Sequence, residues 1–203
     1  PLQAGVWALA LGLDLLGAYV GGGRGWKLAA GHFAERHALI VIIALGETIV
    51  ALGAGASRDL DAGVVVAALL GLAIAAAMWW AYFDVVAIVA ERKLRETTGN
   101  AQLAMARDSY SYLHLPMVAG IVLVALGIKK ILEDVGDPLG TIPAVALCGG
   151  VALYLLGHNA FRLRDIGSVS VPRLVVTVLC CALIPVAVSV PALVTLATLA
   201  VLL

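Results

Sequence analysis

Long apolar runs are the feature that most restricts how this 203-residue chain can fold. A helix needs about 20 mostly apolar residues to cross the hydrocarbon core of a bilayer. Six runs meet or approach that length, separated by polar or glycine-rich breaks. They cover residues 2–20, 32–56, 64–90, 110–131, 142–161 and 174–203. The sequence therefore predicts an all-α fold, a polytopic bundle of about six to seven transmembrane helices, with residues 1–203 as one domain.

The last apolar run is too long for one comfortable span. It contains Pro185 and Pro191, and proline breaks or kinks helices. We therefore expect one helix to end at about Val188 and another to begin at about Pro191. Composition agrees with a membrane protein, because 63% of the residues are hydrophobic and 13% are charged. Soluble domains are typically about 45–50% apolar and about 25% charged.

Lysine and arginine are distributed unevenly between the connections. Ten of the 13 follow the first, third and fifth runs, and the remaining three follow the second and fourth. Cytoplasmic loops of membrane proteins carry an excess of these residues. We therefore expect a multi-pass protein of the cell membrane, with Pro1 on the outer side. The connections expected in the cytoplasm are residues 21–31, 91–108 and 162–173.

The second run carries ionisable groups that a lipid-facing helix would lack. It reads HFAERHALIVIIALGETIVALG from His32 onward. At about 100° per residue, His32, Arg36 and Glu47 share one face, and Glu35 flanks them. Glu47 lies about 18 Å deeper than Glu35, near the midplane, at about 1.5 Å per residue. Because charges in hydrocarbon are costly, we expect this stripe to face the bundle interior or a water-filled cavity, where it binds an ion, a proton or a substrate.

Further polar residues are expected near the cytoplasmic ends of other spans. Asp14 lies in the first run, Asp84 in the third and His114 in the fourth. We expect Arg36 to pair with Asp84 or Asp14, because the arginine fork binds carboxylates in two contacts. Two interpretations stay open. Asp14, Arg36, Asp84 and His114 form a structural network, with His114 as a hydrogen-bonding core histidine, or Asp84 and Arg36 join Glu47 in a binding site.

The sequence offers little support for a metal site, a cofactor or an enzyme. His32 and Glu35 have the spacing of half a metal site on a bundle helix, but no second helix matches it. The cysteines lie inside apolar runs, where they act as small apolar fillers, and we predict no disulfide. No serine or threonine has the surroundings of a nucleophile. A formal net charge of zero suggests no nucleic-acid partner.

The motif around Glu47 resembles the bacterial low temperature requirement A family of membrane proteins. The family pattern is a histidine, a Glu-Arg pair, an apolar run, and then Gly-Glu-Ser or Gly-Glu-Thr. In this sequence the matching residues are His32, Glu35, Arg36, Gly46, Glu47 and Thr48. The segments WWAYFD and YSYLHLPMVAGIVLVALG also look like the family. The resemblance covers essentially the whole chain, but only about the C-terminal half of a full-length member.

This resemblance implies a protein needed for growth in the cold, and it supplies no mechanism. The chain begins and ends inside apolar runs, so we expect a fragment of a longer protein whose N-terminal half is a partner within the bilayer. Tyr82, Phe83 and Asp84 look like a faint counterpart of an FFDLVFV-like element of that half. Such a duplication is common in transporters. A homo-oligomer is left open.

Two functional hypotheses follow for the chain. The first is a transporter or channel coupled to protons or other ions, supported by the midplane Glu47 and the polar stripe that leads to it. The second is a non-transporting membrane scaffold or a cold- and stress-response protein, in which the intramembrane charges fix how the helices pack. An intramembrane enzyme is the least supported class, because the sequence shows no nucleophile or metal set.

Overall fold

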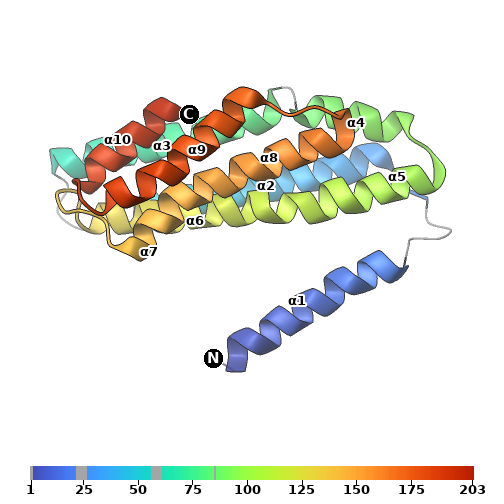
Figure 1. The fold of residues 1–203 in the computed structure, drawn as a ribbon, viewed down its shortest axis with the longest axis horizontal. Helices are drawn as coiled ribbons and strands as arrows, with labels where there is room; N and C mark the ends of the chain where they lie inside the picture. Colours follow the sequence, from blue (N-terminus) through green and yellow to red (C-terminus); the bar gives the residue numbers. More distant parts are fainter. Residues whose placement is uncertain (1, 22–26, 56–60, 85) are drawn as a thin grey trace.

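The computed structural model describes residues 2–21, 27–55, 61–84 and 86–203, which form helices joined by short connections. Figure 1 shows most of them aligned in one elongated bundle. The helices in chain order are α1 (Leu2–Gly21), α2 (Ala30–Gly55), α3 (Ala62–Phe83), α4 (Val86–Glu96), α5 (Gly99–Met105), η1 (Ala106–Tyr112), α6 (Leu113–Glu133), α7 (Thr141–Ala144), η2 (Val145–Gly149), α8 (Gly150–Ile166), α9 (Val171–Ala187) and α10 (Ala192–Leu202).

The expectation of an all-α, multi-pass membrane protein is confirmed. Within the described residues, five helical segments are long and apolar enough to cross a membrane. These segments are residues 2–21, 30–54, 62–96, 99–133 and 141–166, and the last three each join consecutive helices. Helices α9 and α10 are apolar but shorter. Most of the breaks after the first and second apolar runs, residues 22–26 and 56–60, lie outside the described residues.

The charged connection expected over residues 91–108 is mostly helical, which corrects the sequence interpretation. Helix α4 continues to Glu96, and α5 begins only three residues later, at Gly99. An ion pair one turn apart supports the end of α4, with Arg95 2.5 Å from Glu91. Gly99 adopts a positive φ of 64°, which glycine tolerates and which reverses the chain between the two helices. Charged residues thus extend the helices beyond the apolar spans.

The predicted break in the last apolar run is confirmed. Helix α9 ends at Ala187 and α10 begins at Ala192, directly after Pro191. The connection before α7 supplies hydrogen-bond partners to this break. The Leu139 N–H donates to the Ala187 carbonyl at 3.2 Å, and the Ala192 N–H donates to the Asp137 carbonyl at 2.9 Å. Backbone groups at the break are therefore satisfied, as an apolar environment requires.

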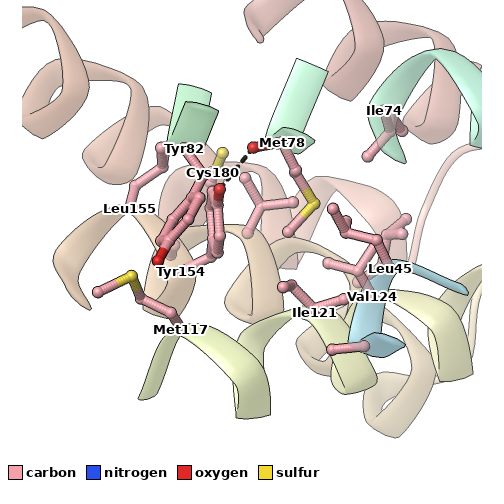
Figure 2. Close-up of a cluster of buried hydrophobic side chains, with 14 of the residues drawn as sticks. Leu45, Ile74, Met78, Tyr82, Met117, Ile121, Val124, Tyr154, Leu155 and Cys180 are labelled. Carbon is pink, nitrogen blue, oxygen red and sulfur yellow. Dashed lines mark hydrogen bonds between the residues drawn. The ribbon is translucent and has the colours of Figure 1, made fainter. Parts of the chain in front are cut away.

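The core of the bundle is centred on α6, which packs closely against α2 and α8. Glycines allow the closest approach, since a Cβ on Gly120 would lie 2.6 Å from the Gly150 carbonyl oxygen. Small residues permit such contacts between membrane helices. By contrast, Gly46 and Gly53 of α2 face open space. Figure 2 shows the side chains between α2, α3, α6, α8 and α9 that fill the centre of this core.

Different helix ends and connections lie at the two ends of the bundle. The ends of α4 and α8 and the starts of α2 and α5 lie at one end, which we call the charged end (Figure 1). The end of α2, the start of α3 and the connections after α6 and α9 lie at the other end. Helix α1 stands apart from the bundle and has no buried residue. Its packing is against η1, where the Tyr112 hydroxyl donates to the Leu15 carbonyl at 2.7 Å.

Candidate functional site

A buried cluster of histidines and tyrosines lies between helices of the bundle near the charged end. Tyr82 comes from α3, His114 from α6 and His158 from α8, and each is at most 3% exposed. Tyr110 comes from η1, and the half-buried His37 comes from α2. Polar residues this deep in an apolar bundle are costly, so they usually serve a function or satisfy one another. We call these five residues the histidine–tyrosine cluster.

Local sequence places each of these side chains on an inner face. Phe33 and His37, Tyr110 and His114, and Tyr154 and His158 are all separated by four residues. Residues four apart lie one above the other on a helix. The paired rings are accordingly close, with centroids 4.6 Å, 5.5 Å and 4.6 Å apart. This recurring spacing of an aromatic residue before a histidine is a signal in the sequence that could have indicated the cluster.

His114 is the hydrogen-bonded centre of the cluster. Its Nε2 lies 2.8 Å from the Tyr82 hydroxyl, and its Nδ1 lies 3.2 Å from the Ser109 carbonyl oxygen. Because that carbonyl is an acceptor, Nδ1 carries the proton, and the Tyr82 hydroxyl donates to Nε2. The expectation that His114 is a hydrogen-bonding core histidine is confirmed. Its hydrogen-bond partners among the described residues are a tyrosine and the backbone, and not a carboxylate.

The π-helical segment η1 places the Ser109 carbonyl where the His114 ring can donate to it. Pro116, inside α6, has no N–H, so the carbonyl of Tyr112 cannot receive its α-helical hydrogen bond. The helix widens to π geometry over residues 106–112, directly before that position. Turns of this kind often occur at functional sites. The Ser109 carbonyl within η1 then meets the ring of His114, five residues later.

The cluster continues in two directions from His114. Toward α2, the ring centroid of His37 lies 5.1 Å away. Toward α8, Tyr82 lies 5.8 Å from His158, centroid to centroid. His158 is fully buried, and neither ring nitrogen has a hydrogen-bond partner among the described residues. His37, His114, Tyr82 and His158 thus form a row from the half-buried His37 on α2 to the fully buried His158 on α8.

Tyr154 supports the row without belonging to it. Its hydroxyl donates to the Met78 carbonyl at 2.5 Å, joining α8 to α3 (Figure 2). Arg173 of α9 donates to the Ala81 carbonyl at 3.1 Å and also acts electrostatically on His158. The bonds to Met78 and Ala81 hold the end of α3, and hence Tyr82, against α8 and α9.

A second polar group, which the sequence analysis missed, lies where η1 meets the end of α8. The Ser109 hydroxyl donates to Asp165, which is 7% exposed. Asp108 lies 2.7 Å from Arg107 and 3.1 Å from Arg164. These bonds join η1 to α8 at the charged end. In the sequence Asp165 and Arg164 belong only to a charged connection, because nothing local brings them to residues 108 and 109.

The structure separates most of the residues that the sequence predicted to work together. Glu47, Arg36, Asp14 and Asp84 are all exposed on the surface of the described bundle. No ion pair joins Arg36 to Asp14 or Asp84 among the described residues. Asp84, at the end of α3, instead acts electrostatically on Arg173. The expected interior stripe is therefore corrected, since α2 turns other residues inward: Ala34, Val41, Ala44, Leu45, Thr48 and Ala51.

His32 and Glu35 form an exposed pair at the start of α2, 3.6 Å apart. They border a shallow cavity of about 470 Å³ at the charged end. The other lining residues are Ala29, Ala30, Gly31, Glu91 and Arg95. Within the described part of the chain, no group of three or more histidine, cysteine or acidic residues has the geometry to hold a metal ion.

Comparison with known proteins gives a consistent picture. The family model for the bacterial low temperature requirement A protein matches residues 1–203. An uncharacterized protein of Rhizobium meliloti (strain 1021) is 33% identical in an alignment of 170 positions that covers 77% of this chain. The chain spans 40% of the length of that relative. No solved structure matches.

Proposed function

We propose that this chain, which belongs to the bacterial low temperature requirement A family, takes part in moving protons or other small cations across the membrane. The observation that carries the proposal is the row of His37, His114, Tyr82 and His158 within apolar spans. Ionisable residues inside a membrane bundle are rare, and they commonly mark proton relays or ion pathways.

The chemistry of the row suits proton transfer. A neutral imidazole has one nitrogen that donates and one that accepts, and a phenol does both through one oxygen. The bond between Tyr82 and His114 is already formed, at 2.8 Å. The ring centroids of His37 and His114 are 5.1 Å apart, and those of Tyr82 and His158 are 5.8 Å apart. A bridging water or a side-chain rotation would connect each pair. The two unpartnered nitrogens of His158 are free to bind such a water.

Glu47 is proposed as a second proton- or cation-binding group, on the outer face of α2. It lies 17 residues from the start of α2, hence about 25 Å along the helix. His32, Glu35 and Arg36 would line its approach from the charged end. Asp84, at the end of α3, would act separately from this set, through its electrostatic effect on Arg173. A carboxylate at such depth is a functional candidate, because simple packing does not need it.

We also propose that the charged end faces the cytoplasm. The connections after the first, third and fifth apolar runs carry ten of the 13 lysines and arginines. An excess of positive residues typically stays on the cytoplasmic side. With this orientation, the histidine–tyrosine cluster lies near the inner surface, and a proton entering at His37 would come from the cytoplasm.

A non-transporting scaffold is the second candidate, and one observation favours it. The bond between Tyr82 and His114 joins α3 to α6, and the bond between Tyr154 and Met78 joins α3 to α8. Hydrogen bonds between membrane helices contribute about 0.6 kcal/mol on average and up to about 1.7 kcal/mol. Two such bonds would help to fix the bundle even if no proton moved through it.

Flux measurements in reconstituted vesicles separate these candidates. The purified protein should carry protons or monovalent cations faster than protein-free vesicles. His114→Gln and His158→Gln keep much of the shape but cannot titrate, so both should abolish flux at normal folded yield. Thr198→Val is the matched control, because this exposed hydroxyl bonds only its own helix, at the Val194 carbonyl, far from the row in sequence. Absence of wild-type flux would favour the scaffold, and flux that survives both histidine changes would exclude the row as the route.

A further inference from the structure

The outer face of α2 carries charged side chains at membrane depth, and no described residue covers them. Arg36 and Glu47 are exposed on a helix whose neighbouring outward residues are apolar, such as Ile43 and Val50. Neither charged group forms an ion pair with a described residue. A charged side chain on a lipid-facing surface is strongly disfavoured. This face therefore needs a protein partner inside the membrane.

Helix α1 has the complementary properties. None of its residues is buried, and Asp14 is its only ionisable carboxylate. A Cβ on Gly5 or Gly12 would meet no other atom within 4 Å among the described residues. Helix α1 is thus a membrane helix with one acidic group and few contacts in its own chain, beside a bundle that presents a basic group without an ion-pair partner among the described residues.

We propose that α1 of one copy packs against the outer face of α2 in a second copy, with Asp14 paired to Arg36. The depths of these residues agree. Asp14 lies seven residues from the charged end of α1, and Arg36 lies six residues from that of α2, hence about 10 Å and 9 Å deep. Helix α1 ends at the charged end and α2 begins there, so the two helices would pack antiparallel.

The same register also accommodates Glu47. It lies about 25 Å from the start of α2, and Gln3 lies about 27 Å from the charged end of α1. Gln3 is eleven residues before Asp14, as Glu47 is eleven residues after Arg36, so Gln3 would lie opposite Glu47, where its amide can donate a hydrogen bond to the carboxyl group. Pairing across two copies is reciprocal, because each copy contributes one α1 and one α2 face to a symmetric dimer.

The contacts of α1 within its own chain favour a second copy as the partner that covers the outer face of α2. Its Leu15 carbonyl accepts a hydrogen bond from Tyr112, and its Tyr19 ring lies 4.6 Å from the Arg107 guanidinium carbon. These contacts hold the charged-end half of α1 against η1. The face of α2 that carries Glu47 is then open to α1 of a neighbouring copy.

Disulfide cross-linking between two tagged copies tests this dimer. One copy carries Asp14→Cys and the other Arg36→Cys, both with the exposed Cys181 changed to serine, expressed together as whole protein in native membranes. Mild oxidation should give a dimer band that carries both tags. The matched control replaces Arg36→Cys with Val178→Cys, since Val178 is also exposed, on α9, and should give no such band.

Charge exchange provides a second readout. Asp14→Arg or Arg36→Asp alone should weaken the dimer about tenfold or more, because each places like charges together in the bilayer. The double exchange should restore dimer formation toward the wild-type level, as measured by co-purification of two tags. Equal cross-linking by the Val178 control, or the absence of a dimer band that carries both tags, would overturn the proposal. So would a double exchange that fails to restore the dimer although the protein folds normally.

Discussion

The close crossing of α6 and α8 predicts that two neighbouring glycines respond in opposite ways to the same substitution. A Cβ on Gly150 would lie 2.8 Å from the Gly120 carbonyl oxygen and 3.0 Å from both the Leu123 Cβ and the Val124 nitrogen. None of these atoms can move away by a side-chain rotation. At Gly149, the nearest atom is the Val145 Cγ1, at an ordinary contact distance of 3.6 Å.

The expected magnitude follows from these contacts. Both glycines have right-handed helical backbone angles, so alanine gains helix propensity about equally at either position, by about 1 kcal/mol at most. Only Gly150→Ala also forces the helices apart, and overpacking of this kind costs about 1–3 kcal/mol. We therefore expect Gly150→Ala to have a free energy of unfolding about 1–3 kcal/mol below that of Gly149→Ala.

The assay is unfolding of the purified protein in mixed detergent micelles, followed by helical content and by elution as a folded monomer or oligomer. Gly149→Ala should match or slightly exceed the wild type in stability. Gly120→Ala serves as a second probe, because its Cβ would lie 2.6 Å from the Gly150 carbonyl oxygen. If Gly150→Ala were as stable as Gly149→Ala, the two helices would not cross as closely as described.

Three further predictions concern single side chains and the topology. Tyr82→Phe removes the donor to His114 and leaves a buried nitrogen unpaired, so it should destabilise the protein by about 1–3 kcal/mol in the same unfolding assay. Asp61→Ala removes the carboxylate that accepts a hydrogen bond from the Val64 N–H at the start of α3, and it should lower the free energy of unfolding by about 1 kcal/mol. Asp61→Asn keeps an acceptor oxygen and should lower the free energy of unfolding only slightly. Cysteines at Arg95 and Lys130 should react with a membrane-impermeant reagent from opposite sides of the membrane, and labelling from one side would contradict the topology.

Much of the fold was predictable because it depends on local properties of the chain. Apolar length predicted the spans, and proline positions predicted the break between α9 and α10. Helix ends in the charged connections were not predictable in the same way. Residues 91–96 and 99–108 look polar enough for a loop, yet pairs such as Glu91 with Arg95 keep them helical. Hydropathy reports where a membrane helix is apolar, and it does not report where that helix ends.

The candidate site was predicted only in part. His114 was expected as a hydrogen-bonded core histidine, and its bonds to Tyr82 and Ser109 confirm this. Glu47 and Arg36 were expected inside the bundle, and the described structure leaves them exposed. The error has a physical origin. Periodicity identifies which residues share a face of α2, but it cannot identify which neighbour covers that face.

The sequence alone determined the class of this protein. Its apolar runs exclude a soluble fold, and its motif around Glu47 led to the family whose model matches the whole chain. Tertiary structure alone decided which polar residues meet. His37, Tyr82, His114 and His158 come from four helices, so their row exists only after those helices pack. Membrane spans form because each can satisfy its own backbone, whereas a site between spans depends on how side chains from distant segments fit together.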